Sequence, residues 1–247
     1  MLCGTWPGQL KKESRLHIPN TPFDPSTALP EVEFIEVEVG SEPRYSVIWL
    51  HGLGADGHDF EPIVPALGLP DSFPVRFLFP HAPERPITVN GGIEMRGWYD
   101  IREWSLNRNE DEEGLEQSRQ IVHALIEQEN RRGIPSDRIF LAGFSQGGAV
   151  ALFTGLRYPR RLAGIIALSC YLPVADRTAT ERSPNNQFTP IFMGHGRDDQ
   201  TVPYMVAELS KDRLLKMDYN INWKTYPMMH AVHPQEVADI SGFLQAG

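Results

Sequence analysis

Two features that mark extracellular and membrane proteins are scarce in this sequence. Its 247 residues include only two cysteines, Cys3 and Cys170, which are too few for a disulfide framework. No apolar run approaches the roughly 20 residues that a membrane-spanning helix needs, and the N-terminus lacks the charged and then apolar pattern of a secretory signal. We therefore expect a cytoplasmic protein without stable membrane insertion.

The sequence also has fewer positively charged residues than negatively charged ones. The chain has 23 lysines and arginines against 32 aspartates and glutamates, which gives a formal net charge of -9 at pH 7. The basic residues form no cluster that could attract phosphate groups. This balance argues against a nucleic-acid partner and against attraction to anionic lipid surfaces.

Hydrophobic residues, in contrast, are plentiful enough for a sizeable core. They make up 41% of the chain, and α/β proteins of this length commonly form a single domain. Residues 1–30 contain scattered prolines and polar residues with no apolar period, which predicts an irregular N-terminal extension. The folded domain is then expected over residues 31–247, and the extension is a candidate contact for a homodimer.

Strand-like and helix-like patterns alternate along the predicted domain. Alternating or continuous apolar residues predict strands at 31–39, 45–50, 75–79, 138–143, 162–168, 189–194 and 221–226. Helical spacing predicts helices at 112–132, 146–158, 202–217 and 234–244. Strands that alternate with helices require crossover connections, so we predict an α/β fold with a mostly parallel central sheet and helices on both faces.

The most informative segment is RIFLAGFSQGGA at residues 138–149. A predicted buried strand runs into Gly143-Phe144-Ser145-Gln146-Gly147 and then into a predicted helix, which is the arrangement of a nucleophile elbow. Such a turn lifts the serine hydroxyl clear of the sheet, and flanking glycines avoid collisions between a Cβ atom and the neighbouring backbone. A G-x-S-x-G string can occur by chance, but here strand and helix flank it in the required order. We predict Ser145 as a catalytic nucleophile.

A serine nucleophile needs a base, and in hydrolases with this elbow an acid and then a histidine follow along the chain. Asp198 and Asp199 both lie just past the sixth predicted strand, at the edge where open α/β sheets bind ligands. His230 lies at the same edge, past the seventh. His233 precedes Pro234, a typical first residue of a helix, so His230 is the favoured base and His233 the alternative.

The oxyanion that forms on an attacked carbonyl needs two N–H donors. The Gln146 N–H is one candidate, because it follows the nucleophile at a helix N-terminus where the dipole favours negative charge. The other is the Leu53 N–H, in the glycine-rich segment HGLGADG at residues 51–57 that directly follows an early strand. The glycines alone are weak evidence, and the position of the segment supports the assignment.

Residues 82–109 form a long stretch without a clear period, and loops of that length in a compact domain are usually functional. Trp98, Tyr99 and Trp104 lie close together in this stretch. They predict an apolar groove for an acyl chain, and the alternative is that these aromatics only pin the loop to the body. The residues that we assign to the groove are Ile87, Met95, Trp98 and Val202.

Together these segments resemble the carboxylesterase and acyl-protein thioesterase family of α/β-hydrolases, also called the phospholipase/carboxylesterase family. The resemblance extends over about residues 31–244 and looks nearest to the bacterial carboxylesterase branch. The matching segments are LHGLGADGHDF at 50–60, FPHAPERPITVNGGIEMRGWYDI at 79–101, GFSQGGA at 143–149, HGRDDQTVP at 195–203 and YPMMHAVHPQE at 226–236.

The resemblance implies the α/β-hydrolase fold and a serine esterase mechanism. The family pattern His-Gly-x-x-Asp-x-x-Val-Pro places the acid on Asp199, and the resemblance implies Leu53 and Gln146 as the oxyanion donors. Residues 1–30 depart from the family, whose members usually begin near the first strand. We expect a carboxylesterase that hydrolyses small-molecule esters of short to medium acyl chain, without a cofactor, through a Ser-His-Asp triad. The alternatives are an acyl-protein thioesterase and a lysophospholipase, because the same triad serves oxyesters and thioesters.

Other classes of function fit less well. The spacing His230-x-x-His233 suits metal ligands on a helix, but Pro234 interrupts such a helix and no carboxylate or cysteine cluster completes the site, so we predict no metal. A non-catalytic binding protein on this fold would typically have lost a triad residue. A dehalogenase would carry Asp in place of Ser145, and a peptidase would be expected to have a large insertion that gates peptides.

Overall fold

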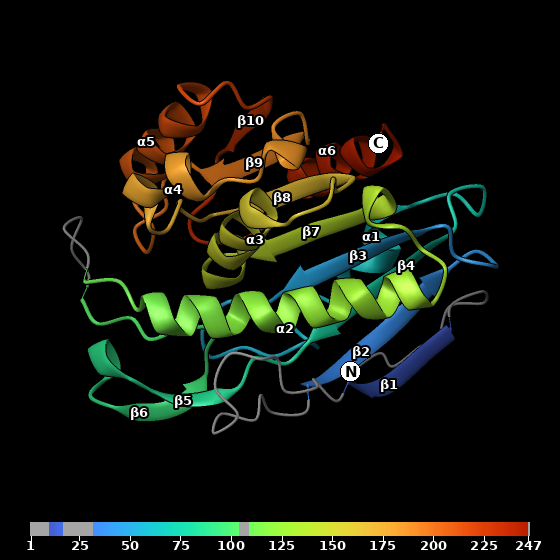
Figure 1. Ribbon diagram of the computed structural model, residues 1–247, viewed down its shortest axis with the longest axis horizontal. Helices are drawn as coiled ribbons and strands as arrows, with labels where there is room; N and C mark the ends of the chain where they lie inside the picture. Colours follow the sequence, from blue (N-terminus) through green and yellow to red (C-terminus); the bar gives the residue numbers. More distant parts are fainter. Residues whose placement is uncertain (1–9, 17–31, 104–108, 247) are drawn as a thin grey trace.

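The computed structural model describes residues 10–16, 32–103 and 109–246, and its centre is an eight-stranded sheet in the order β1-β2-β4-β3-β7-β8-β9-β10 (Figure 1). In this sheet β4, β3, β7, β8, β9 and β10 run parallel to one another, and β1 and β2 are antiparallel to their neighbours. This is the mostly parallel sheet predicted from the sequence. The strands of this sheet are β1 (Leu10–Leu16), β2 (Val32–Val39), β3 (Tyr45–Leu50), β4 (Val75–Pro80), β7 (Ile139–Phe144), β8 (Gly164–Leu168), β9 (Ile191–Gly196) and β10 (Ile221–Tyr226).

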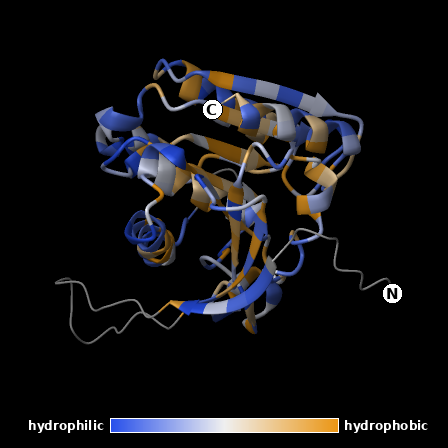
Figure 2. Cartoon of the chain, turned by 90° about the vertical axis from the view of Figure 1, so that its right-hand side faces the viewer, coloured by the Kyte–Doolittle hydropathy of each residue, from blue (hydrophilic) through white to orange (hydrophobic). Residues whose placement is uncertain are grey.

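The helices form a layer on each face of this sheet. One hydrophobic core holds apolar residues of α2, α3 and α5, and a second, on the other face, holds those of α1 and α6, which contact each other. Hydrophobic residues concentrate in the central strands and polar ones on the outer helix surfaces (Figure 2). In the ranges that the structure describes, no helix has the length and apolar character to cross a membrane. The helices are α1 (Ile63–Leu67), α2 (Glu112–Arg131), α3 (Gln146–Arg157), α4 (Ala175–Glu181), α5 (Tyr204–Leu215) and α6 (Pro234–Gln245).

The burial of each strand follows from its place in the sheet. Every residue of β4 and β8 is buried, because both faces of these inner strands are covered, whereas β10, at one edge, alternates between partly buried and exposed residues. The continuous apolar runs in the sequence therefore mark the inner strands. The parallel strands all end at the same edge, and the predicted nucleophile, acid and base follow β7, β9 and β10 in the chain.

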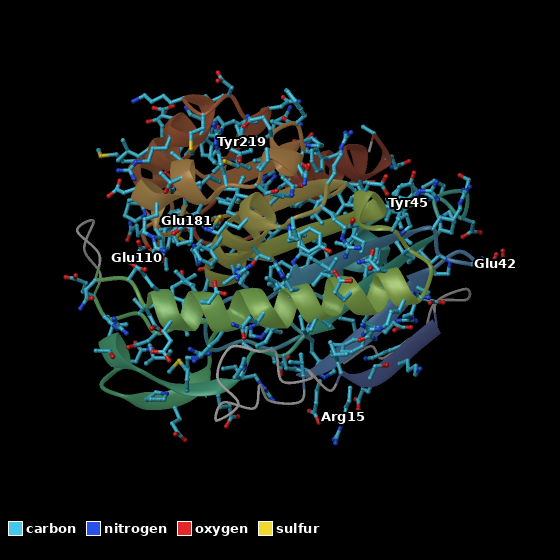
Figure 3. All side chains as sticks on the ribbon, viewed as in Figure 1. Arg15, Glu42, Tyr45, Glu110, Glu181 and Tyr219 are labelled. Carbon is cyan, nitrogen blue, oxygen red and sulfur yellow. The ribbon has the colours of Figure 1, made fainter. Side chains whose placement is uncertain are left out.

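The prediction of irregular structure for residues 1–30 is wrong for Leu10–Leu16, which forms the outermost strand, β1. This strand pairs antiparallel with β2 along its whole length, from Leu10 opposite Glu38 to Leu16 opposite Val32. Its sequence, LKKESRL, is polar because an edge strand is held by backbone hydrogen bonds and leaves many side chains in solvent. Arg15 points outward from this edge, 2.6 Å from Glu33 (Figure 3). The remaining residues of 1–30 lie outside the described ranges, and the two-part division of the chain stays a prediction.

The stretch 82–109, expected to lack regular structure, contains a small hairpin. Strands β5 (Glu84–Ile87) and β6 (Ile93–Arg96) pair antiparallel below α2 (Figure 1). They are too short and too polar to give a strand period in the sequence. A 3-10 turn at Thr88–Asn90 and two glycines with φ of 70° and 79° make the connection, a conformation that glycine adopts without strain.

Candidate active site

Ser145 lies at the sharp turn between β7 and α3. Its backbone angles, φ 54° and ψ -119°, form a left-handed conformation that costs a non-glycine residue about 1–3 kcal/mol. A Cβ atom added to Gly143 would come within 2.3 Å of backbone atoms, and one added to Gly147 within 2.2 Å, so only glycine fits at either side. The turn therefore has the geometry of a nucleophile elbow.

Asp199, rather than Asp198, is the aspartate that faces His230. Its side chain is buried, and its Oδ2 atom lies 2.7 Å from His230 Nδ1, whereas Asp198 is exposed. The other oxygen, Oδ1, accepts hydrogen bonds from the N–H groups of Thr201 and Val202 at 2.9 Å each. Burial acts to raise the pKa of this carboxyl group, but the hydrogen bonds from His230 and Val202 outweigh it, and the pKa is lowered. Asp199 is therefore an ionised acceptor at neutral pH.

His230 lies in the loop between β10 and α6. Its side chain is 19% exposed, and its ring centroid lies 4.7 Å from that of Phe144. With Nδ1 donating to Asp199, Nε2 is the ring nitrogen left to accept a proton. His233 has a different place, because its side chain accepts a hydrogen bond from the Gln235 N–H and caps α6. Of the two histidines that the sequence offers, His230 is therefore the one that contacts Asp199, and His233 caps a helix.

The glycine-rich segment after β3 lies directly beside the elbow, since a Cβ atom on Gly52 would be 3.6 Å from Ser145 Cβ. His51 shapes this segment: its Nε2 accepts the Ala82 N–H at 3.0 Å, and its Nδ1 lies 2.7 Å from the Gly52 carbonyl oxygen. Burial lowers the pKa of His51 to about 4, so the ring is neutral and Nδ1 is its donor. In the described part of the chain the Leu53 N–H has no backbone or side-chain acceptor. It is a free donor beside Ser145.

Gln146, the other predicted donor, begins α3, so its N–H belongs to the positive end of that helix. Its side chain has a role that the sequence analysis missed. The amide oxygen accepts the Trp98 N–H at 2.8 Å, and the amide nitrogen donates to the Tyr99 carbonyl at 2.6 Å. A glutamine amide can satisfy a donor and an acceptor at once, which a carboxylate cannot. The two bonds fix residues 98 and 99 against the elbow.

A cavity of about 520 Å³ opens beside the elbow and has Ser145, His230, Leu53 and Gln146 in its wall. Val202, one of the residues predicted for the acyl groove, lines this cavity together with the start of α5. Cavities of this size, mostly apolar with a few convergent polar groups, are typical binding sites for small molecules. The other apolar and aromatic residues of the wall are Ala55, Tyr99, Ile101, Phe144, Tyr171, Pro203, Met205 and Val206, and the charged ones are Asp59, Asp100, Arg102, Glu103 and Glu110.

Three residues predicted for the acyl groove lie elsewhere. Trp98 is fully buried, because its indole N–H finds an acceptor in the His51 carbonyl at 2.9 Å and its ring packs in the core. Ile87 is fully buried at the end of β5. Met95, in β6, lines a separate cavity next to the glycine-rich segment. Trp104, which the prediction grouped with Trp98, lies outside the described residues.

Two tyrosines occupy the place expected of the tryptophan. The Tyr99 and Tyr171 hydroxyl oxygens are 2.6 Å apart, and both residues line the cavity. The sequence carried a partial signal for each: Tyr99 belongs to the aromatic group of the predicted groove, and Tyr171 follows a strand that ends at the active edge. The exposed Met205 side chain, at the start of α5, gave no such signal.

Among the residues with described positions, no group of three or more His, Cys, Asp or Glu side chains could hold a metal ion. Cys170 is buried beside α3, where burial raises the pKa of its thiol and keeps it protonated. The chemistry that the arrangement supports therefore centres on Ser145.

The sequence is similar to a known family profile and to named fungal proteins. The profile of the family described as Phospholipase/Carboxylesterase matches residues 32–247. A Neurospora crassa protein named acyl-protein thioesterase 1 is 44% identical over 209 residues, which are 81% of this chain and 85% of that protein. The Gibberella zeae protein of the same name is 41% identical over 214 residues, or 83% of this chain and 91% of that one.

Solved structures give the same result. The Arabidopsis thaliana protein SOBER1 superposes with a TM-score of 0.78 at 31% identity, and the match covers 82% of this chain and 98% of that chain. Acyl-protein thioesterase 2 of Zea mays superposes with a TM-score of 0.76 at 28% identity, covering 85% and 97%. The carboxylesterase of Bacillus cereus, at 20% identity and a TM-score of 0.66, shares the fold.

Proposed function

The chain belongs to the phospholipase/carboxylesterase family of serine hydrolases, which have the α/β-hydrolase fold, and from this membership we propose that it is an acyl-protein thioesterase. Its substrate would be a fatty acyl group in thioester linkage to a cysteine of another protein. The observation that carries this proposal is that His230, which lies 2.7 Å from Asp199, is in the same cavity wall as Ser145. The names of the fungal relatives favour this substrate over the small esters expected from the sequence.

In the proposed first step, His230 Nε2 takes the proton of the Ser145 hydroxyl as Oγ attacks the thioester carbonyl carbon. Asp199 holds the imidazole in the required tautomer and stabilises the imidazolium that forms. The carbon–sulfur bond then breaks, and His230 returns the proton to the departing cysteine sulfur. In the second step His230 deprotonates a water molecule that attacks the acyl-enzyme, and the fatty acid leaves as Ser145 regains its proton.

The negative charge that develops on the carbonyl oxygen has two candidate donors. The N–H groups of Leu53 and Gln146 are the proposed donors: both residues line the same cavity as Ser145, and the α3 dipole adds to the second. Loss of one such donor typically costs about 10²- to 10³-fold in kcat. The apolar wall formed by Val202 and Met205 suits an acyl chain, and each methylene buried there is worth about 0.8 kcal/mol.

The test is a comparison of three substrates with the same enzyme: a peptide palmitoylated on cysteine, the same peptide palmitoylated on serine, and p-nitrophenyl acetate. The cysteine thioester should have the highest kcat/KM, and Ser145→Ala should abolish its hydrolysis. The matched pair His230→Ala and His233→Ala should differ sharply, with only the first inactive. Efficient hydrolysis of p-nitrophenyl acetate with no hydrolysis of the thioester would instead support the carboxylesterase assignment.

A further inference from the structure

Glu236 is a buried carboxyl group that the proposed reaction does not use. It lies in the first turn of α6 with 0% of its surface exposed. A Cβ atom on Gly194, in β9, would lie 2.1 Å from Glu236 Oε1, so the glycine makes the room that this carboxyl group fills. In the described part of the structure Oε1 has no hydrogen-bond partner. A group that is this costly to bury calls for an explanation.

The contacts of Glu236 lead to the loop that carries His230. Its Oε2 atom accepts the His233 N–H at 3.3 Å, while the His233 side chain accepts the Gln235 N–H at 3.1 Å. This reciprocal pair is a capping box, which satisfies two N–H groups that the start of a helix would otherwise leave without acceptors. Because the box closes three residues after His230, it fixes the end of that loop.

The beginning of the loop is held from the same helix. The Tyr226 hydroxyl donates to Asp239 at 2.8 Å, and the Tyr226 ring stacks on that of His233 with centroids 5.8 Å apart. In between, the Met228 and Met229 carbonyl oxygens lie 2.4 Å from where a Cβ atom on Gly196 would be. The loop is therefore pressed against the segment that leads to the acid of the triad.

Among the residues that the structure describes, no cation balances this carboxyl group. The titratable groups that face it are His233 on the loop, and Asp239 and Tyr226, which bond to each other; no described lysine or arginine contributes to its environment. Burial raises the pKa of Glu236 to about 8, the His233 N–H opposes this, and the nearby Asp239 charge adds to it. At pH 7 the carboxyl group is mostly protonated and neutral.

We propose that Glu236 is a positioning residue, whose buried carboxyl group, seated over Gly194 and bonded to the His233 N–H, holds the His230 loop against Asp199. The proposal rests on the proposed function for the role that it gives His230. It adds that ionisation of Glu236 places an unbalanced charge behind the loop, so the imidazole loses its alignment. The rate of acyl transfer then falls as the pH rises past about 8.

The experiment measures kcat and KM on the best ester or thioester, together with the rate at which a fluorophosphonate labels Ser145, for three variants. Glu236→Gln keeps the size, the neutrality and the acceptor, so at pH 7 it should resemble the wild type and should lack the alkaline fall. Glu236→Leu removes the acceptor and should lower kcat and labelling about 10- to 100-fold with little change in KM, since small misplacements of a catalytic group cost this much. Asp239→Asn, which removes the neighbouring charge, should shift the alkaline fall to lower pH.

The labelling rate keeps this inference separate from the proposed function. Loss of thioester hydrolysis in the wild type, with labelling that follows the pattern above, would overturn the substrate and leave the role of Glu236 in place. Wild-type kcat and labelling in Glu236→Leu, or an unchanged alkaline fall in Glu236→Gln, would overturn the positioning role. If Glu236→Leu does not fold, the pH profile of Glu236→Gln decides.

Discussion

At the scale of single residues, Asp199 is a buried group of the candidate site with every side-chain oxygen bonded. Both of its oxygens have partners, the Thr201 and Val202 N–H groups on one side and His230 on the other. Its lowered pKa means that it stays ionised down to low pH, so its protonation does not limit activity at neutral pH. Asp198, one position earlier, points into solvent.

This difference predicts a sharp contrast between two matched variants. Asp199→Asn should lower kcat by about 10⁴-fold, because an amide in this place stabilises the wrong histidine tautomer and no imidazolium. Asp198→Asn should leave kcat within the error of the assay. Steady-state kinetics on one ester, with circular dichroism to check the fold of both proteins, makes the comparison. Equal activity of the two variants would contradict the assignment of the acid.

Some residues of the candidate site could be identified from the sequence, and others could not. Spacing alone left Asp198 and Asp199 open, and the family pattern chose the one that contacts His230. No sequence pattern could predict whether Trp98 or Tyr99 enters the core. The indole N–H of Trp98 needs a buried acceptor, and that acceptor, the His51 carbonyl, is distant in sequence. The side-chain bonds of Gln146 were unpredictable for the same reason.

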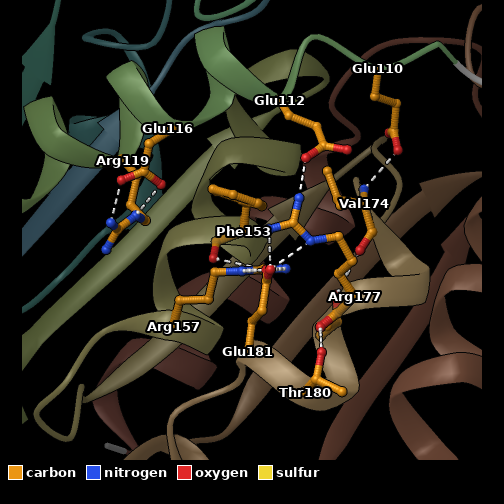
Figure 4. A network of polar contacts seen from close by, with 11 residues as sticks. Glu110, Glu112, Glu116, Arg119, Phe153, Arg157, Val174, Arg177, Thr180 and Glu181 are labelled. Carbon is orange, nitrogen blue, oxygen red and sulfur yellow. Dashed lines mark hydrogen bonds and ion pairs between the residues drawn. The ribbon is translucent and has the colours of Figure 1, made fainter.

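At the scale of elements, a polar network connects α4 to α2 and α3 (Figure 4). Arg157 of α3 donates to Glu181 of α4 at 2.9 Å and lies 4.0 Å above the Phe153 ring, and its side chain is only 7% exposed. Arg177 of α4 contacts both Glu112 of α2 and Glu181, but its side chain is 56% exposed. The two arginines therefore make similar ion pairs but differ in how far their side chains are buried.

The two arginines should differ in their contribution to stability. Arg157→Ala should lower the free energy of unfolding by about 2–3 kcal/mol, since it removes a buried stem, a cation–π contact and an ion pair. Arg177→Ala should produce no measurable change, because water screens and replaces an exposed pair. Urea unfolding of the two variants beside the wild type measures both effects. A larger loss in Arg177→Ala would show that the exposed part of the network is the stabilising one.

The sequence predicted the strands and helices in which apolar residues recur with a regular period. It did not predict those that are too short for such a period or are defined by backbone pairing. The strands from β2 to β10 of the main sheet, and the helices α2, α3, α5 and α6, lie within about two residues of their predicted bounds. The strand β1 and the β5–β6 hairpin were missed because backbone pairing, rather than burial of an apolar face, defines them. The helices α1 and α4, with 5 and 7 residues, are too short for a helical period to emerge.

At the scale of the whole molecule, buried titratable groups make the free energy of unfolding depend on pH, some lowering it as the pH falls and one lowering it as the pH rises. Burial lowers the pKa of His51 and of His123 to about 4 and also lowers that of His195. A histidine whose pKa is lowered in the folded protein stays neutral there, but it takes up a proton when the protein unfolds. The free energy of unfolding therefore decreases as the pH falls below about 6.5, the pKa of an unfolded histidine. Glu236 works in the other direction. Its pKa, raised to about 8, makes stability fall as the pH rises from about 4.5 to 8.

The free energy of unfolding should therefore pass through a maximum near pH 6.5. Below it, His51 and His123 should each lower stability by about 1.4 kcal/mol per pH unit, which exceeds the opposite slope from Glu236. Above it, Glu236 alone lowers stability at that slope. Urea unfolding at a series of pH values measures the curve, with His123→Phe expected to flatten the acid side and Glu236→Gln the alkaline side. Stability that increases from pH 6.5 to 8 would contradict this account.

The left-handed backbone of Ser145 has a consequence for the history of such a sequence. Folding alone would favour glycine at this position, because glycine adopts a φ of 54° without the cost that serine bears. Only selection for chemistry keeps the serine. A lineage released from that selection would gain stability by a single substitution at this position, since most proteins lie close to a stability threshold. A relative with the same elbow and glycine in place of the serine would therefore be one that has given up catalysis and kept the fold.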